Sequence, residues 1–468
     1  MKERMQKTLS QVNGCPQRDR SETERYGGVQ TFMWMCEDNI VEVPFDKEHF
    51  FEQIFSPSNL SRAYKAVMRN KGSGGIDKMS CEQLLPWLLA NKDELIRSLM
   101  DGSYRPNPVP VKRVEIPKDN GKMRLLGIPT VVDRLVQQAI NQVLTPIYEN
   151  QFSKTSYGFR PRRGCHDALR GAQRIINEGY IYVVDLDLER FFDTVSHSKL
   201  IEILSRTIKD GRVGSLIHKY LRSGVMNKGL FEASEEGTPQ GGPLSPLLSN
   251  IMLNELDKEL ERRGLPFVRY ADDSMIFCKS KRAAMRVKES ITRFIENTLY
   301  LKVNKEKTVV SYVRGVKYLG YSFYVMKGKC QLTVHPKAKM KAKLKELTSR
   351  SNGWGYAKRK QKLEEYIKGW VGYYHLANMK RFLIETDEWL RRRLRMCIWK
   401  SWKRVKTRVA NLVKCGIDKY QAYMWGNSRL GYWRIAGSYI LSRAITNEKL
   451  NMAGYATLMG SYIEWHPK

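Results

Sequence analysis

The amino-acid sequence predicts an α+β protein in which a sheet-bearing region is followed by a helical one. Strand–turn–strand patterns surround Asp119-Asn120-Gly121 and Ala271-Asp272-Asp273-Ser274. Beyond Pro336 the apolar residues recur with the spacing of an α-helix. The composition changes there too, because residues 331–468 hold 29 Lys and Arg against 9 Asp and Glu, and eight of the ten Trp. We therefore predict a domain boundary near residue 333.

The N-terminal part begins with polar sequence. Residues 1–45 show no sustained period, so we predict a loosely ordered extension, with Phe32 to Met35 as a candidate docking patch. Helical spacing starts at Lys47 and breaks at the glycine-rich run 71–75. It resumes as an amphipathic helix from Leu84 to Met100.

The strands follow. Residues 109–117 and 123–128 are predicted strands, and residues 133–144 a helix that stops near Pro146. Residues 181–186 form an almost continuous apolar run, typical of a buried strand. A second hairpin pairs residues 267–270 with 275–278. Three helices are expected after the boundary, at 338–347, 358–376 and 380–403.

The net charge points to a polyanionic partner. The chain has 81 Lys and Arg against 48 Asp and Glu, a formal net charge of +33. Cations neutralise phosphates, and aromatic rings stack on unpaired bases, although each Trp taken singly is more often a core residue. Hydrophobic residues make up 42% of the chain, which excludes wholesale disorder.

Other classes of protein are disfavoured. No apolar run approaches the roughly 18–20 residues of a membrane span, and the first residues lack a hydrophobic signal segment. The eight Cys form no CxxC pair, which argues against a zinc ribbon or a disulfide framework. We therefore expect the eight Cys to be reduced thiols, and the protein to be cytoplasmic and without a membrane partner.

Two groups of carboxylates follow predicted strands. Asp185 and Asp187 stand at the end of the buried strand, and Asp272 and Asp273 stand in the second hairpin turn. Charges placed there are costly unless they are paired or bind a metal, and adjacent aspartates repel each other. Hard oxygen ligands suit Mg²⁺, and two ions about 3.5–4 Å apart assist phosphoryl transfer. The alternative is that Asp272 and Asp273 merely serve the turn.

These residues carry a resemblance to the reverse transcriptases encoded by group II introns. Tyr270-Ala271-Asp272-Asp273 resembles their YxDD box, and Asp187 with Phe192 and Asp193 resembles their first palm motif. Further matching segments are residues 116–118, 124–129, 156–161 and 237–246, and, in a maturase-like thumb, residues 367–374 and 392–395. The resemblance spans about residues 47 to 410 and is specific because the motifs occur in order.

The resemblance implies roles for single residues. Asp187, Asp272 and Asp273 would be the catalytic, metal-binding residues for two Mg²⁺ ions, for which Mn²⁺ can substitute. Asp193 is not assigned to a metal, and capping of the next helix is its alternative. The nucleotide-binding residues would be Lys118, Arg124, Phe192 and Gln240. Phe192 would exclude the 2′-hydroxyl, unless it is an ordinary core residue. Lys307 is a candidate general acid, with an exposed lysine as the alternative.

The resemblance also implies an architecture and partners. It predicts right-hand polymerase fingers and palm (46–333) with an antiparallel palm sheet, an α-helical thumb or maturase domain (334–410) and a small C-terminal DNA-binding segment (411–468). The partners would be group II intron RNA, an RNA template with a DNA primer, target DNA and dNTPs, in the bacterial cytoplasm and at the nucleoid. Neither the oligomeric state nor the particular intron follows from the sequence. The candidate RNA-binding residues are Lys339, Lys341, Lys343, Arg391, Arg392, Arg393 and Arg395. A solvated charged face is their alternative.

The late cysteines, Cys397 and Cys415, have no nearby Cys partner, so we expect a member of the family that lacks the metal-bearing endonuclease and uses existing 3′ ends as primers.

Three rival functions stay open. A splicing cofactor would bind RNA without extending a primer, and a host-defence reverse transcriptase would have no flanking intron. An RNA-dependent RNA polymerase would incorporate ribonucleotides efficiently despite Phe192.

Overall fold

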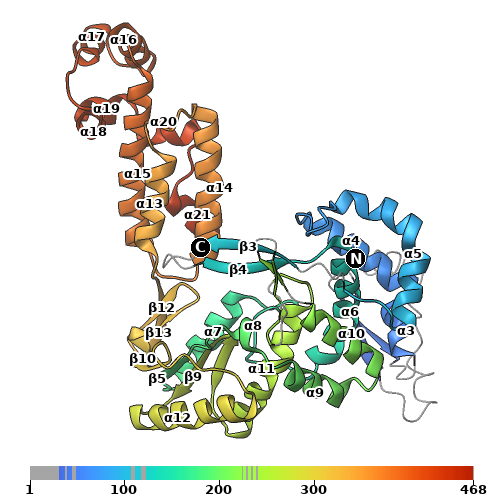
Figure 1. The fold of residues 1–468 in the computed structure, drawn as a ribbon. Coiled ribbons are helices and arrows are strands. Elements are labelled where there is room, and N and C mark those ends of the chain that lie inside the picture. The colour runs from blue at the N-terminus through green and yellow to red at the C-terminus, as the bar shows by residue number, and fades with distance from the viewer. Residues whose placement is uncertain are drawn as a thin grey trace, which may run out of the picture. The chain divides into compact units, whose positions relative to one another are not determined.

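The computed structural model describes residues 31–36, 39–44, 49–106, 111–117, 123–223, 225–227, 230–232, 236–238 and 241–466. Of these, residues 31–36, 39–44, 111–117, 123–126, 225–227 and 230–232 are described by their backbone alone. The chain divides into two compact units, Met1–Tyr312 and Val313–Lys468, each of which is described by itself. Figure 1 shows both units. The division falls about twenty residues before the boundary that we predicted near residue 333.

The main sheet of the N-terminal unit is antiparallel, as the fold class predicts. Its strand order is β10-β5-β9-β8. The strands are β5 (Tyr182–Leu186), β8 (Phe267–Tyr270), β9 (Asp273–Cys278) and β10 (Val309–Tyr312). Helix α12 (Lys281–Thr298) packs on β5, β9 and β10, and α7 (Cys165–Asn177) packs on β8. The expected hairpin is present, with β9 beginning two residues earlier than expected.

A second sheet has the order β4-β3-β6-β7. Strands β3 (Val111–Pro117) and β4 (Met123–Ile128) match the first predicted hairpin, whose turn lies outside the described residues. Strands β6 (Val225–Asn227) and β7 (Leu230–Glu232) extend this sheet. Within the predicted extension, β1 (Thr31–Cys36) and β2 (Asn39–Pro44) pair as a hairpin, whereas residues 1–30 are outside the description.

Helices of the N-terminal unit and the main sheet share one hydrophobic core. The other helices described in this unit are α3 (Phe50–Ile54), α4 (Pro57–Asn70), α5 (Leu84–Met100), α6 (Val131–Glu149), α8 (Phe191–Thr194), α9 (His197–Thr207), α10 (Gly211–Arg222) and α11 (Ser245–Arg262), with a short 3₁₀ turn at Cys81–Gln83. Helix α6 runs past Pro146, so the predicted stop was wrong. Leu144, Pro146 and Tyr148 are all buried there, and their burial outweighs the backbone hydrogen bond that proline cannot make.

The C-terminal unit begins with a small antiparallel sheet of β11 (Lys317–Tyr318), β12 (Tyr321–Met326) and β13 (Lys329–Val334), preceded by a 3₁₀ turn at Val313–Gly315. Tyr321 on β12 is fully buried, and its ring lies against Tyr373 and Tyr374 on the helix that follows. This packing joins the sheet to the helices behind it, which explains why the unit starts before residue 333.

Nine helices complete the described part of the C-terminal unit. They are α13 (Lys337–Leu347), α14 (Tyr356–Tyr374), α15 (Lys380–Ser401), α16 (Val405–Lys414), α17 (Lys419–Gly426), α18 (Tyr432–Ala436), α19 (Tyr439–Ala444), α20 (Asn447–Met452) and α21 (Leu458–Glu464). The first three match the predicted helices within two residues at each end. Within the described residues, no helix has the length and apolar character that a membrane crossing requires.

Candidate active site

The turn between β8 and β9 presents Asp272 and Asp273 to solvent at the edge of the main sheet. Tyr270 pairs with Asp273, which makes this a two-residue hairpin turn. Ala271 takes a left-handed conformation, with φ of 58°. The turn is thus tight, and both carboxylates project from a short rigid segment.

A buried arginine anchors this turn. Arg269 is fully buried and forms a bidentate ion pair with the equally buried Asp257, at 2.5 and 2.8 Å. The same guanidinium donates to Asn250 Oδ1 at 2.9 Å and to the carbonyl oxygen of Ala271 at 3.0 Å. A buried charge is stable only when paired and hydrogen-bonded. Arg269 therefore fixes the backbone immediately before the two carboxylates.

Gly158, in the matched segment 156–161, packs on the other side of the turn. A Cβ atom at Gly158 would lie 2.2 Å from the backbone nitrogen of Ala271, so only glycine permits this approach. The carbonyl oxygen of Gly158 accepts a hydrogen bond from Asn250 Nδ2 at 2.9 Å. The segment and the turn are thereby held by the same asparagine that binds Arg269.

Asp187 emerges beside Asp273. Leu186 lies opposite Ser274 in the β5–β9 ladder, so the next residue along the chain comes alongside Asp273. The backbone nitrogen of Asp187 donates to Thr308 Oγ1 at 3.2 Å, and its carbonyl oxygen accepts from the backbone nitrogen of Asn304 at 2.9 Å. These contacts fix the segment that leaves the sheet.

The gathered carboxylates perturb one another. Loss of water around its carboxyl, followed by the charges of Asp272, Asp185 and Asp187, raises the pKa of Asp273 to about 6. Loss of water, followed by the charge of Asp187, raises the pKa of Asp185 to about 6 as well. Shifts of this direction show that negative charge is concentrated at one edge of the sheet. The structure thus brings the strand-end carboxylates, Asp185 and Asp187, together with the hairpin carboxylates, Asp272 and Asp273.

Lys307 supplies a cation at the same edge. Its Nζ lies 3.2 Å from Asp187 Oδ2, while 67% of its side chain stays exposed. The position of Lys307 is compatible with both interpretations, a general acid and an exposed lysine, since the side chain is exposed and also lies next to the carboxylates. An ammonium group at this place shows that the edge accommodates positive charge.

The donor set fits a divalent cation of the magnesium type. Four carboxylates provide oxygen ligands and a negative field, which together with burial raises the pKa of two of them, Asp185 and Asp273. Among the residues that the structure describes, no group of three or more His, Cys, Asp or Glu side chains is arranged so that it could by itself hold a metal ion. Mg²⁺ usually takes only one or two carboxylates and completes its shell with waters and substrate phosphates. Asp187, Asp272 and Asp273 are the residues that would hold the ions.

Phe192 lies close to the carboxylates in sequence but is almost buried. It is 8% exposed and packs edge-on against Phe191, with ring centroids 5.3 Å apart. Its carbonyl oxygen accepts a hydrogen bond from the backbone nitrogen of Thr238 at 2.6 Å. This bond ties Phe192 to the start of the matched segment 237–246.

His197 reinforces that connection. Its Nε2 lies 2.6 Å from the carbonyl oxygen of Gly237, and burial lowers the pKa of His197. A neutral imidazole with Nε2–H donating to Gly237 fits both observations. His197 thus joins the first palm motif to the glycine-containing segment.

Several predicted residues cannot be placed. Lys118 and Gln240 lie outside the described residues, and Arg124 is on β4 with its side chain undescribed. Asp193 is exposed within α8, and the cap of the next helix, α9, is Ser196, so the suggested capping role of Asp193 was wrong.

The candidate RNA-binding lysines are on the surface of α13. This helix buries Met340, Leu344 and Leu347, and it exposes Lys339, Lys341, Lys343 and Lys345 on the remaining arc. Some of this charge is used within the unit, because Lys343 pairs with Glu346 at 2.7 Å and Lys341 lies over the Phe382 ring. The exposed positions of Lys339, Lys341 and Lys343 are compatible with RNA binding and with the alternative of a solvated charged face.

The arginines of α15 have mainly internal partners, which corrects their interpretation as a phosphate track. Arg391 is only 3% exposed and donates to Asn451 Oδ1 and to the carbonyl oxygen of Tyr455. Arg393 donates to Thr348, and Arg395 donates to the carbonyl oxygen of Ile445. Arg392 stacks on Trp433 and donates to its carbonyl oxygen. Density of positive charge in the sequence did not reveal these acceptors.

Sequence reasoning missed the residues that position the turn, namely Arg269, Asp257 and Asn250, and the connecting His197. One signal was present: Arg269 interrupts an apolar strand, and a buried arginine there requires a carboxylate partner. For His197 and Asn250 the sequence offers no comparable signal.

Two family models match the chain. Residues 116–323 match reverse transcriptase (RNA-dependent DNA polymerase), and residues 337–416 match the group II intron maturase-specific domain. Protein YkfC of Escherichia coli is 35% identical over 309 residues, which cover 57% of this chain and 81% of that protein. The group II intron-encoded protein LtrA of Lactococcus lactis is 32% identical over 362 residues, which cover 62% of this chain and 58% of LtrA.

Among solved structures, a partial Cas6-RT-Cas1–Cas2 complex matches with a TM-score of 0.35 and 25% identity, covering 56% of this chain and 44% of that chain. The two family models, in this order, and the sequence relatives agree with the carboxylate-bearing sheet and the helical unit that follows it. The chain therefore belongs to the group II intron-encoded reverse transcriptases, in which an RNA-directed DNA polymerase domain precedes a maturase domain.

Proposed function

We propose that this chain extends the 3′ end of a DNA primer along group II intron RNA and also binds that RNA to promote splicing and retrohoming. The single observation that carries the polymerase half is the convergence of Asp185, Asp187, Asp272 and Asp273 at one edge of the main sheet. In this reaction the primer 3′-oxygen forms a bond to the α-phosphorus of a dNTP, and the bond to the pyrophosphate leaving group breaks.

In this proposal the carboxylates bind the metal ions. Asp187, Asp272 and Asp273 would bind two divalent ions, which when bound favour the ionised 3′-hydroxyl and stabilise charge on the leaving oxygen. Arg269 and Gly158 keep the hairpin carboxylates in place during the reaction. Lys307, beside Asp187, is the proposed proton donor to pyrophosphate.

Nucleotide selection is assigned to Phe192, with Lys118, Arg124 and Gln240 as further nucleotide-binding residues. A ring held beneath the sugar clashes with a 2′-hydroxyl. The edge-on packing against Phe191 and the bond from Thr238 support a rigid ring. Phe192→Ala should relax discrimination against ribonucleotides, measured as the ratio of kcat/KM for dNTP and rNTP. An unchanged ratio would leave Phe192 as a core residue only.

A primer-extension assay on an RNA template with Mg²⁺ tests the polymerase half. The unmodified chain should extend the primer, and Asp187→Asn and Asp272→Asn should each lower the rate by at least about 100-fold, because charge stabilisation supplies much of such catalysis. Asp193→Asn is the matched control, since this carboxylate is exposed on α8. Full activity of Asp272→Asn would contradict the proposal.

The maturase half is tested separately with the same variants. Asp272→Asn should still bind intron RNA and promote its splicing, because the carboxylate edge serves polymerisation alone. If the unmodified chain binds RNA and promotes splicing but extends no primer, the chain is a splicing cofactor and the polymerase half fails.

A further inference from the structure

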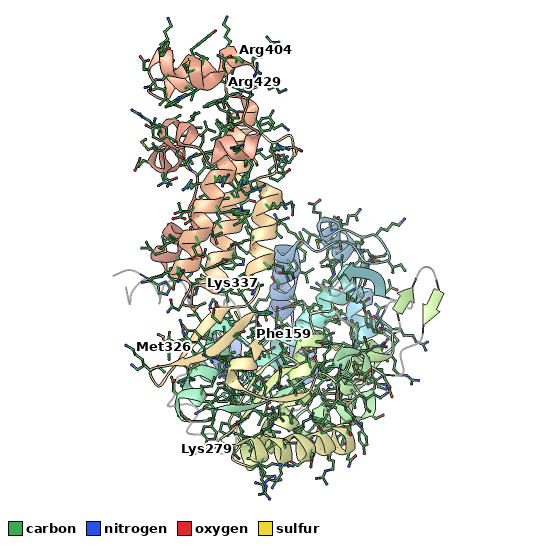
Figure 2. All side chains as sticks on the ribbon, turned by 90° about the vertical axis from the view of Figure 1, so that its left-hand side faces the viewer. Phe159, Lys279, Met326, Lys337, Arg404 and Arg429 are labelled. Atoms are coloured by element: carbon green, nitrogen blue, oxygen red, sulfur yellow. The ribbon has the colours of Figure 1, made fainter. Side chains whose placement is uncertain are left out.

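The end of the C-terminal unit carries almost no negative charge. Residues 389–447 contain 14 Lys and Arg and a single acidic residue, Asp418. Four of these arginines, on α15, have partners within the unit, whereas other cations are exposed, among them Lys403, Arg404, Lys406, Lys414, Lys419 and Arg429. The carboxylate of Asp418 caps α17, where it accepts hydrogen bonds from the backbone nitrogens of Tyr420 and Gln421 at 2.9 and 3.3 Å. Figure 2 shows Arg404 and Arg429 at the end of the unit where Figure 1 shows α16 and α17. This surface therefore suits a polyanion.

The outer face of α17 is aromatic. The inner face packs on α16 through Ala422 and Gly426, and a Cβ at Gly426 would lie 2.7 Å from Val409 Cγ2. On the other side of the helix, Tyr420 is 74% exposed and Tyr423 is 63% exposed. Met424 beside them is also exposed. Two tyrosines three residues apart lie on the same face of a helix, so their rings form one surface.

A further ring stands beside α17. Tyr439 on α19 is 65% exposed, and its ring lies 6.1 Å from that of Trp425, at the edge of α17. Arg443 donates to the Tyr439 hydroxyl at 2.5 Å, and its guanidinium lies 5.8 Å from the ring centroid. The ring is thus oriented from within the unit, with a cation at its side.

Exposed rings among cations fit unpaired bases better than a duplex. In a duplex the bases already stack on one another, and only phosphates face the protein outside the grooves. An unpaired base instead gains stacking energy on an aromatic ring whatever its sequence, while the cations follow the backbone.

We infer that the outer face of α17, together with Tyr439, is a stacking platform for the unpaired bases of single-stranded DNA. The inference rests on the proposed function, because polymerisation needs a DNA 3′ end and a strand opened from a duplex exposes its bases. It names the single strand, rather than the duplex, as what this surface holds.

The first experiment maps the contact on the full chain. A single-stranded DNA containing 5-bromodeoxyuridine is irradiated with the protein while the polymerase site is filled with a chain-terminated template–primer. Trypsin cleaves after Lys419 and Arg429, so residues 420–429 form one peptide that contains both exposed tyrosines. We expect a cross-link to this peptide. Its absence would overturn the inference.

The second experiment measures affinity by fluorescence anisotropy with an oligothymidine of about 20 nucleotides, longer than a site for single strands usually requires. The double variant Tyr420→Ala/Tyr423→Ala should bind about 10- to 100-fold more weakly, because two stacking rings are lost. Tyr420→Phe/Tyr423→Phe should bind like the unmodified chain. Tyr300→Ala removes an exposed tyrosine from the other unit and should have no effect.

Each contrary outcome has a distinct meaning. Equal weakening for a hairpin duplex would indicate phosphate contacts, and weakening for oligouridine alone would indicate RNA; either result overturns the inference. A Phe variant as weak as the Ala variant would assign the effect to the hydroxyls. Primer extension by the Ala variant on a preannealed template–primer should be unchanged, so failure of the polymerase proposal would be seen separately in the unmodified chain.

Discussion

At the scale of single residues, the ionised carboxylates of Asp273 and Asp185 lower the folding stability of the metal-free chain. Their pKa values of about 6 lie above the usual value for aspartate, so both carboxyls bind protons more readily in the folded chain than in the unfolded one. Their unfavourable contribution to stability is absent below about pH 4, grows as the pH rises to about 6, and is fully present above that. Bound cations relieve the repulsion only when the carboxylates are ionised.

We therefore expect Mg²⁺ to raise the melting temperature more at pH 7.5 than at pH 5. Thermal unfolding with and without Mg²⁺ at both pH values measures this difference. Asp185→Asn should stabilise the metal-free chain at pH 7.5, because it removes one of the repelling charges, whereas Asp193→Asn should not. An equal effect of Mg²⁺ at both pH values would contradict the assignment of the carboxylates to metal.

His197 is the second prediction at the residue scale. Removal of its buried hydrogen bond to Gly237 costs about 1–3 kcal/mol of folding stability and loosens the segment to which Phe192 is tied. His197→Ala should lower kcat/KM for dNTP about tenfold and reduce discrimination against rNTP, because Phe192 is tied to the same segment. His197→Gln keeps a donor and should retain more of both. If only the melting temperature changes, His197 has a purely structural role.

At the scale of elements, the catalytic hairpin depends on the segment that packs behind it. Gly158→Ala would place a methyl group within 2.2 Å of the Ala271 backbone and displace the turn. Displacement by about 1 Å is enough to lower a rate about 100-fold. We expect this loss in primer extension, with the circular dichroism spectrum unchanged. Gly214→Ala, in α10 with no atom within 4 Å of the added Cβ, is the control and should keep full activity.

The helices of the C-terminal unit divide the positive charge between two tasks. The lysines of α13 are exposed, and we propose that they contact RNA, whereas Arg391 of α15 is buried among protein acceptors. Replacing Lys339, Lys341 and Lys343 by Gln should weaken RNA binding and flatten its salt dependence without changing the melting temperature. Arg391→Gln should instead destabilise the chain by about 1–3 kcal/mol. Titration of labelled intron RNA and thermal unfolding separate the two effects, and the reverse pattern would restore the arginine track.

At the scale of the whole molecule, the net charge of +33 governs association with nucleic acid. Each phosphate contact releases counterions, so affinity for structured RNA should fall steeply between about 50 and 200 mM salt, by roughly 10³-fold or more for six or more contacts. A plot of log affinity against log salt concentration gives the number of contacts. A flat line would show that the excess charge does not serve RNA binding.

Much of the function is readable from the sequence because its chemistry is local. Asp187, Asp272 and Asp273 stand directly after apolar strands. An almost continuous apolar run predicts the first of these strands, and a strand–turn–strand pattern predicts the antiparallel hairpin. The order of motifs then identified the family. The end of α6 was misjudged, because proline alone suggested a stop while the burial of Tyr148 kept the helix going.

Tertiary structure alone decided which charged groups face the solvent and which support the site. Arg269 lies in an apolar run and Arg391 in a run of arginines. Each is buried because it donates a hydrogen bond to a residue distant in sequence, Asp257 for Arg269 and Asn451 for Arg391. Gly158 matters only because the hairpin packs on it. Local sequence determines strands, helices and reactive groups through short-range patterns, whereas burial and pairing depend on contacts between distant segments, which no local pattern contains.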